Sequence, residues 1–226
     1  MTVPSSGILI IAYGDDHYFQ EANTLIARIR QVWPEVSIKL ITEGAGKPKM
    51  LGRLHGIRAT PFDRTLFLDT DCWLVDPVPE LFEILSNFNL ALPLSPWRRV
   101  YPLDVPACFY DVCPATLAYR KDSEFQEFLD DWERRFMRDY EMMSGVSNPH
   151  VGFFHSQPSF TEALYHSDLR FAILGQEYGW QGTGHVQQKV KIVHKRPSPE
   201  EAARIINVAA GLPRTKLLFE GVRVWD

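Results

Sequence analysis

Short apolar runs alternate with longer amphipathic stretches along the first part of the chain. Residues 8–13 form a continuous apolar run, which is typical of a strand buried on both faces of a parallel sheet. Residues 17–33 carry apolar side chains at helical spacing, and Pro34 ends this predicted helix. The alternation continues through predicted strands and helices at 36–41, 48–59, 65–69, 79–87 and 90–94. This order predicts an α/β fold with a mostly parallel central sheet flanked by helices.

The rest of the chain is less regular. Residues 95–114 are rich in proline and aromatic residues and have no clear period, which indicates a functional loop. The further predicted elements are a strand at 116–119, a helix from 123, a loop at 144–158, a helix from 159, strands at 171–174 and 190–194, and a helix from 198. No repeat or linker divides the sequence, so residues 1–226 are expected to form a single domain.

The composition of the chain is that of a protein with one large hydrophobic core. The 226 residues are 45% hydrophobic and 12% aromatic, and their net charge is −4. No basic run or stripe is present, so a nucleic-acid partner is not expected. Cys72, Cys108 and Cys113 are odd in number and match no zinc spacing, which indicates reduced thiols. The apolar run at 8–12 is too short for a signal sequence or a transmembrane segment, and we expect a cytoplasmic protein.

The strongest chemical signal is the sequence from Thr65 to Asp71, a strand-like apolar run that ends in Asp69 and Asp71. Side chains alternate across a strand, so carboxylates spaced i, i+2 are expected to point to the same side. Open α/β sheets bind ligands at the carboxyl ends of their strands. Two carboxylates there suit Mg²⁺ or Mn²⁺, which fill their other positions with water and substrate phosphate. The alternative is a solvated strand end at which Asp71 begins a turn.

This part of the chain resembles the A-type (GT-A) glycosyltransferases, which transfer sugars from nucleoside-diphosphate donors. The resemblance rests on Lys49 and Arg53, one helical turn apart, on the turn at 60–64 and on the strand at 65–71, and it covers about residues 7–95. It implies a GT-A-like single domain, with a Rossmann-like nucleotide-binding half over about 1–95 and an acceptor half over about 96–226. It also implies a hexosyltransferase-like enzyme with a UDP- or GDP-sugar donor, whose acceptor is a saccharide, a lipid-linked molecule or a protein.

The resemblance further implies roles for individual residues. Asp69, Asp71 and His194 would hold Mn²⁺ or Mg²⁺, one of the aspartates acting partly through the donor ribose or water. The other donor-binding residues would be Tyr13 against the base, Lys49 and Arg53 at the diphosphate, Lys195 at a phosphate, and Thr70 as a further contact to the nucleotide-sugar. Gln157 would lie near the reacting carbon of the sugar, as the catalytic residue. Structural roles remain as alternatives for three of these residues: His194 as an ordinary strand-end histidine, Tyr13 as a packing residue and Lys195 as a solvated cation.

Two departures from the family pattern leave the chemistry open. Gln157 follows His155 and Ser156 instead of the carboxylate found in many relatives, so a general base is unassigned, with Glu162 a remote candidate. The Asn-x-Gly acceptor motif is absent, and residues 111–114 stand in its approximate place. Retaining and inverting transfer therefore both remain open. Two other functions compete: a catalytically inactive GT-A fold that serves as a binding module, and a Mg²⁺-dependent phosphatase or phosphotransferase with Asp69 as nucleophile.

Overall fold

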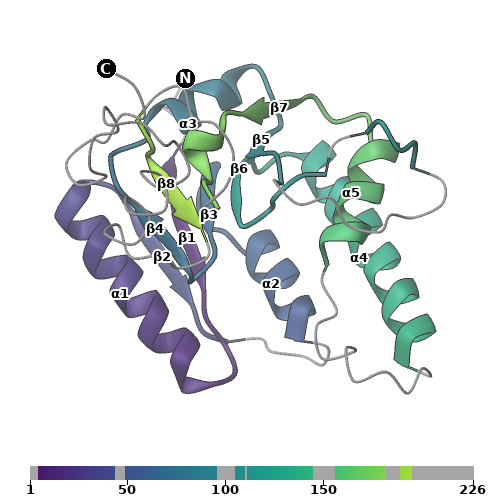
Figure 1. The fold of residues 1–226 in the computed structure, drawn as a ribbon, viewed down its shortest axis with the longest axis horizontal. Helices are drawn as coiled ribbons and strands as arrows, with labels where there is room; N and C mark the ends of the chain where they lie inside the picture. Colours follow the sequence, from purple (N-terminus) through teal and green to yellow (C-terminus); the bar gives the residue numbers. More distant parts are fainter. Residues whose placement is uncertain are drawn as a thin grey trace, which may run out of the picture.

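The computed structural model describes residues 5–43, 49–95, 105–109, 111–144, 156–181 and 189–194. Their centre is a six-stranded sheet with the strand order β2-β1-β3-β6-β5-β7 (Figure 1). The strands of this sheet are β1 (Ser6–Ile11), β2 (Ile38–Ile41), β3 (Arg64–Leu68), β5 (Leu90–Pro93), β6 (Thr116–Arg120) and β7 (Phe171–Leu174). The sheet contains strands from both the donor half and the acceptor half expected from the sequence.

The sheet is mostly parallel, as the strand–helix alternation predicts. β1 pairs in parallel with β2 and β3, and β5 pairs in parallel with β7. β6 lies between β3 and β5 and is antiparallel to both. The carboxyl ends of all the other strands of this sheet, and the amino end of β6, therefore meet at one edge.

Helices cover both faces of this sheet (Figure 1). Ile8 and Ile10 of β1 pack in one hydrophobic cluster with the buried stripe of α1 (Asp16–Val32). Leu9 and Ile11 pack in a second cluster on the opposite face. That face is covered by α2 (Lys49–Arg58), α4 (Ser123–Ser144) and α5 (Gln157–His166). Burial on both faces explains the uninterrupted apolar run of β1.

A second sheet contains β4 (Cys72–Leu74) and β8 (Ile192–His194), which run antiparallel. Cys72 is the Cα partner of His194 across this pair. α1 packs against β4, and Arg28 of the helix donates a hydrogen bond of 3.0 Å to the Leu74 carbonyl. The sequence did not predict β4, because three residues are too few to show a period.

Several boundaries differ from expectation. The helix expected at 79–87 is α3 (Glu80–Glu83) followed by a 3-10 turn, η1 (Ile84–Ser86). The range predicted for the loop, 144–158, extends too far, because Gln157 and Pro158 already belong to α5. The sequence Ser-Gln-Pro-Ser has the composition of a loop, but proline is tolerated in the first turn of a helix, where its missing N–H has no intrahelical partner. The helix expected from 198 lies outside the described residues.

Candidate metal centre and donor site

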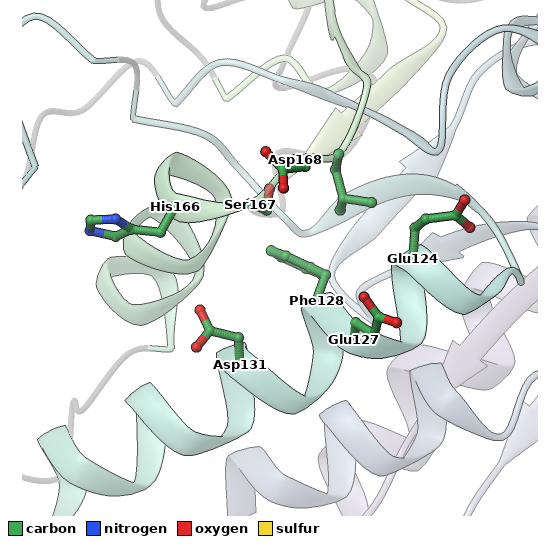
Figure 2. A pocket seen from close by; sticks show the side chains of 8 residues that line it. Glu124, Glu127, Phe128, Asp131, His166, Ser167 and Asp168 are labelled. Atoms are coloured by element: carbon green, nitrogen blue, oxygen red, sulfur yellow. The ribbon is translucent and has the colours of Figure 1, made fainter.

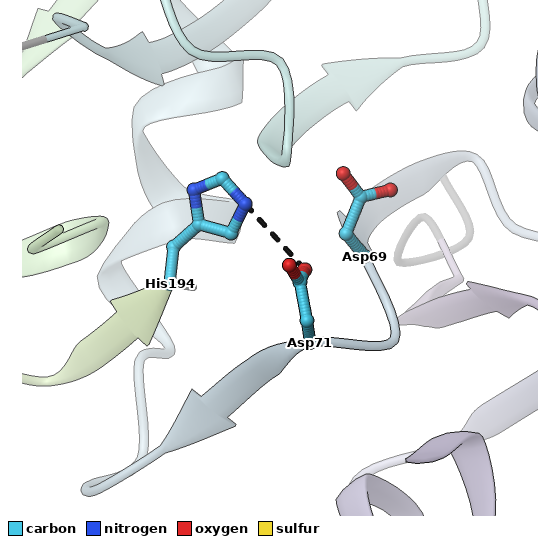
Figure 3. A group of neighbouring side chains, drawn as sticks. All are labelled: Asp69, Asp71 and His194. Atoms are coloured by element: carbon cyan, nitrogen blue, oxygen red, sulfur yellow. Dashed lines mark ion pairs between the residues drawn. The ribbon is translucent and has the colours of Figure 1, made fainter. Parts of the chain in front are cut away.

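Asp69, Asp71 and His194 converge at the carboxyl end of β3 (Figure 3). One ligand atom of each residue lies within 4.8 Å of the other two. The sequence predicted that alternation along a strand would bring the two aspartates together. The strand β3 ends at Leu68, however, so neither aspartate belongs to it. Asp69 instead begins a turn, closed by a 3.0 Å hydrogen bond from the Cys72 amide to the Asp69 carbonyl. The sequence prediction of proximity was correct, but a turn brings the carboxylates together.

His194 reaches the two aspartates through the pairing of β4 with β8. Its Nε2 lies 3.5 Å from Oδ1 of Asp71. Two carboxylates and an imidazole form a donor set that suits Mn²⁺ and, through the carboxylates, Mg²⁺. The residues present therefore fit the ion that the sequence resemblance implies.

Electrostatic interactions couple these three groups. Burial raises the pKa of Asp69 to about 6, and the neighbouring Asp71 adds to this, while Arg53 and His194 oppose it. Burial alone would raise the pKa of Asp71, but the hydrogen bond and the charge of His194, together with Arg53, hold it below its ordinary value. The pKa of His194 is raised to about 10; burial alone would lower it, but the Asp71 carboxylate stabilises the imidazolium. Metal binding requires the neutral imidazole, so an ion would displace this proton.

Arg53 of α2 is a largely buried cation that pairs with Asp69. One terminal nitrogen lies 3.3 Å from Oδ2 of Asp69, and the other donates to the Pro114 carbonyl at 2.5 Å. The guanidinium lies over the Phe67 ring, 4.9 Å from its centre, and 13% of the side chain is exposed. Arg53 thus fixes the orientation of Asp69. Lys49, the other basic residue expected at the diphosphate, is the first residue of α2.

Tyr13 lies beside this ion pair, two residues after the end of β1. Gly14 follows with a φ of 95°, a backbone angle that turns the chain away at low cost only for glycine. The Tyr13 ring rests on α2 at Gly52, where a β-carbon would lie 2.9 Å from the ring. Burial raises the pKa of Tyr13 to about 12, so the phenol is neutral at physiological pH. Base stacking on this ring stays a prediction.

Thr70 and Lys195 are the two remaining residues expected to bind the donor. Thr70 lies in the turn between Asp69 and Asp71, and its hydroxyl donates a 2.9 Å hydrogen bond to Glu21 of α1. A ribose could therefore reach Thr70 through its backbone or through the hydroxyl lone pairs. Lys195 lies outside the described residues.

Gln157 lies at the start of α5, and its side-chain amide donates a 2.9 Å hydrogen bond to Asp111. Asp111 begins a segment, residues 111–115, that leads from Gln157 to the metal ligands. Within it, Sγ of Cys113 lies 3.4 Å from Nδ1 of His194, and the Ala115 carbonyl accepts a 2.9 Å hydrogen bond from the Asp69 amide. Sequence reasoning assigned no role to Asp111 or Cys113. The available signal was that these residues stand where the family places its acceptor motif.

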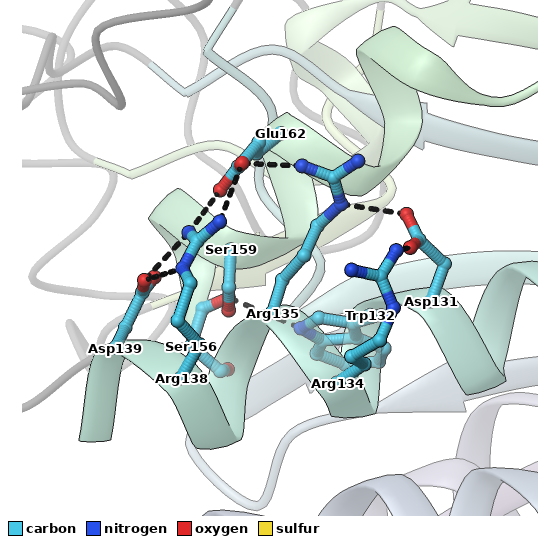
Figure 4. Close-up of polar contacts among 9 residues, drawn as sticks. All are labelled: Asp131, Trp132, Arg134, Arg135, Arg138, Asp139, Ser156, Ser159 and Glu162. Atoms are coloured by element: carbon cyan, nitrogen blue, oxygen red, sulfur yellow. Dashed lines mark hydrogen bonds and ion pairs between the residues drawn. The ribbon is translucent and has the colours of Figure 1, made fainter. Parts of the chain in front are cut away.

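The packing of α5 on α4 fixes the position of Gln157 (Figure 4). Trp132 donates a 3.3 Å hydrogen bond to the carbonyl of Ser156, the residue before Gln157. Glu162, whose side chain is 2% exposed, forms ion pairs with Arg135 and Arg138 of α4. This buried carboxylate is fully engaged in joining two helices, so it is not available as the general base considered from the sequence.

A separate hollow of about 250 Å³ lies between α4 and the connection from α5 to β7 (Figure 2). It is lined by Glu124, Glu127, Phe128, Asp131, His166, Ser167, Asp168 and Leu169. Its carboxylates would repel a nucleoside diphosphate. None of the residues predicted for the donor or the metal ion lines this hollow.

The chain superposes on solved glycosyltransferase structures. It aligns with the apo form of the glycosyltransferase GlyE of Streptococcus pneumoniae TIGR4 with a TM-score of 0.56 and 14% identity, over 86% of this chain and 55% of that one. It aligns with the galactosyltransferase LgtC in complex with donor and acceptor sugar analogues with a TM-score of 0.56 and 12% identity, over 92% of this chain and 97% of that one. The chain has a GT-A fold. An LgtC variant with an active-site glutamine replaced by glutamate matches at a TM-score of 0.54 and 13% identity.

This GT-A chain spans about half the length of the GlyE structure. No protein-family model matches its sequence, and a search of curated proteins found no relative. Among the described residues of the GT-A fold, no helix has the length and apolar character needed to cross a bilayer.

Proposed function

We propose that the protein is a metal-dependent glycosyltransferase that moves a sugar from a UDP or GDP donor to an acceptor. One observation carries this proposal. Two aspartates and a histidine from distant parts of the chain bring their ligand atoms within 4.8 Å of one another, at the carboxyl edge of a GT-A sheet. Ligands of open α/β sheets bind at this edge. The three residues form a hard, anionic site of the kind that holds Mn²⁺ or Mg²⁺ against a diphosphate.

Asp69, Asp71 and His194 would hold the ion. A bound divalent cation supplies Lewis acidity, neutralising the negative charge that develops on the departing diphosphate. The ion pair with Arg53 keeps Asp69 oriented, and the base would stack on the ring of Tyr13. Lys49 and Lys195 would add positive charge beside the phosphates, and Thr70 would contact the ribose.

The magnitude of the charge effect makes the metal site essential. One opposite-charge contact at about 4 Å contributes ~4 kcal/mol at an effective dielectric constant of about 20. Because a factor of ten in rate corresponds to about 1.36 kcal/mol, loss of the ion should reduce the rate by several powers of ten.

Gln157 is assigned the place beside the reacting carbon of the sugar. Two observations support this: the hydrogen bond from Gln157 to Asp111, and the connection from Asp111 to the metal ligands through residues 111–115. In LgtC, a glutamine belongs to the active site. Gln157 has an amide side chain and is not a base, so it would hold the sugar in place for attack.

The test is nucleotide binding in the presence and absence of metal. Thermal unfolding is followed with UDP and with GDP, each with and without Mn²⁺. Nucleotide at 100 times its dissociation constant should add about 2.7 kcal/mol to the free energy of unfolding. Asp71→Asn should abolish the Mn²⁺-dependent part of the shift while leaving the unliganded protein folded. Asp130→Asn, an exposed aspartate on α4, is the matched control and should behave as the wild type.

The outcomes separate the competing functions. Absence of a Mn²⁺-dependent shift with either nucleotide would contradict the proposal. Donor binding without hydrolysis or transfer, over a broad panel of acceptors, would indicate an inactive binding module. Phosphate release from an aryl phosphate that is lost in Asp69→Asn would indicate the phosphatase instead.

A further inference from the structure

The helix α1 lies beside the segment that follows β3 and holds it at two points (Figure 1). In the second turn of α1, Glu21 accepts a 2.9 Å hydrogen bond from the hydroxyl of Thr70. Two turns further along, Arg28 donates its 3.0 Å hydrogen bond to the Leu74 carbonyl. Residues seven apart lie on the same face of a helix, so both contacts come from one edge of α1. They fix the two ends of the stretch from Thr70 to Leu74.

Packing in the core determines where Glu21 lies. The residues Ala22, Leu25 and Ile29 form the buried stripe of α1, and Glu21 lies one turn before Leu25 at the margin of that stripe. Glu21 and Thr70 are both half-buried. A hydrogen bond to a carboxylate is stronger than one between neutral groups, and partial burial strengthens it further because the surroundings are less polar than water. The bond therefore ties the metal-binding turn firmly to a helix that the core holds in place.

Each of the three residues in the metal-binding turn is attached to a different element. Its two aspartates pair with Arg53 of α2 and with His194 of β8. Thr70 lies between the aspartates and bonds to Glu21 of α1. The backbone dihedrals of Thr70 help to set the distance and angle between the flanking carboxylates, because they are the soft rotations between the two ligands. Threonine has few χ1 rotamers, and these depend on the backbone, so holding the hydroxyl also restricts the backbone.

We propose that Glu21 is a positioning residue for the metal-binding turn and acts through the hydroxyl of Thr70. This inference rests on the proposed glycosyltransferase function, which assigns the ion to Asp69, Asp71 and His194. Glu21 is not among the residues whose ligand atoms lie within 4.8 Å of one another, so it orients the turn and does not bind the ion. Side chains that orient metal ligands in this way usually contribute about 10- to 100-fold to metal affinity.

The test measures Mn²⁺ affinity by titration calorimetry, with the metal alone and again with UDP or GDP. Thr70→Val keeps the shape of the side chain but removes the donor, and should weaken Mn²⁺ binding about tenfold. Thr70→Ser restores a hydroxyl and should bind within about threefold of the wild type, a rescue that a purely structural role of the side chain would not produce. Thr24→Val is the matched control, because it removes a hydroxyl that bonds only within α1, to the Gln20 carbonyl, and it should bind Mn²⁺ normally.

A double-mutant cycle separates positioning from the charge of Glu21. Glu21→Met alone should weaken Mn²⁺ binding about tenfold. In the Thr70→Val background it should change the affinity by less than about threefold, because the bond through which Glu21 acts is already absent. Wherever Glu21→Met fails to fold, Glu21→Gln replaces it in the cycle.

The outcomes distinguish the inference from the function on which it rests. Mn²⁺ affinity at the wild-type level in Thr70→Val would overturn the inference, as would an equal loss in Thr70→Ser. An effect of Glu21 that persists undiminished in the Thr70→Val background would also overturn it, because the carboxylate would then act by its charge. A wild-type protein that binds no Mn²⁺, alone or with UDP or GDP, would overturn the proposed function itself.

Discussion

Cys113 and His194 share a hydrogen bond, with Sγ 3.4 Å from Nδ1, on the side of the imidazole opposite Asp71. Metal-binding histidines usually use their second nitrogen in this way, which fixes the ring and directs the first nitrogen at the ion. Cys113→Ala should therefore weaken Mn²⁺ binding by about 10- to 100-fold. Titration calorimetry measures this directly. Cys108→Ala, at an exposed cysteine, is the control, and equal affinities in the two variants would show that Cys113 does not position the ligand.

The absence of a side chain at Gly52 should be needed for the Tyr13 ring to stack on a nucleotide base. A β-carbon at this position would meet the ring at 2.9 Å, so Gly52→Ala must displace Tyr13. Alanine also favours the helix by about 1 kcal/mol, which offsets part of the collision in the folding free energy. We expect a UDP affinity about tenfold lower, since an aromatic pair contributes about 0.5–1.5 kcal/mol, with little change in melting temperature. Tyr13→Phe retains the ring and should bind UDP normally; a strong loss there would mean that the hydroxyl, not stacking, matters.

Glu162 should be one of the most sensitive positions for stability. Its nearly inaccessible carboxylate pairs with both Arg135 and Arg138 across the contact between α4 and α5, and these arginines also pair with Asp131 and Asp139. Glu162→Gln leaves these cations without their buried counter-charge, which should lower the free energy of unfolding by about 3–5 kcal/mol. Urea denaturation provides the measurement. Arg134→Gln breaks a pair whose arginine is 70% exposed, and the expected loss there is at most about 1 kcal/mol. Similar losses in both variants would refute this distinction.

Glu80 should make the stability of the protein depend on pH. It forms an ion pair with Lys191, directly before β8, and accepts a 2.7 Å hydrogen bond from Tyr178. Burial alone would raise the pKa of Glu80, but these hydrogen bonds hold it below its ordinary value. A carboxyl group with a lowered folded-state pKa stabilises the protein above its unfolded-state pKa, and this stabilisation disappears as the pH falls through the folded-state value. Glu80→Gln should thus be less stable than the wild type at neutral pH.

Glu80→Gln and the wild type should become equally stable in acid, at a pH below the range in which glutamate titrates. Urea denaturation at neutral and acidic pH tests this. Glu83→Gln removes an exposed charge from the same short helix and controls for the change in net charge. A deficit in Glu80→Gln that persists undiminished in acid would mean that packing, not ionisation, is responsible.

The parallel core of the fold was predictable because its signal is local. Ile8, Leu9 and Ile10 are all fully buried, on alternating faces, and this double burial is what produces an unbroken apolar run. The approach of Asp69 to Asp71 was predictable for a similar reason, since two residues so close in sequence cannot separate far.

The remaining parts of the site depend on contacts that no local pattern records. β4 is three residues long and is recognisable only through its partner β8. Asp111 and Cys113 lie in a segment without a period, where the sequence shows neither the pairing of Val112 with Leu94 nor the contact with His194. Sequence resemblance suggested His194 as a ligand, but its place beside Asp71 follows from that distant pairing.

Because the candidate metal centre is completed by the pairing of β4 with β8, we expect it to form late in folding. Its third ligand, His194, lies in β8, far along the sequence from the first two, which belong to a turn formed by neighbours in sequence. Contacts between distant residues close large loops and form slowly. Tight manganese binding would consequently report that β8 has paired with β4, and a chain arrested before that event could hold its large sheet without being able to bind the ion.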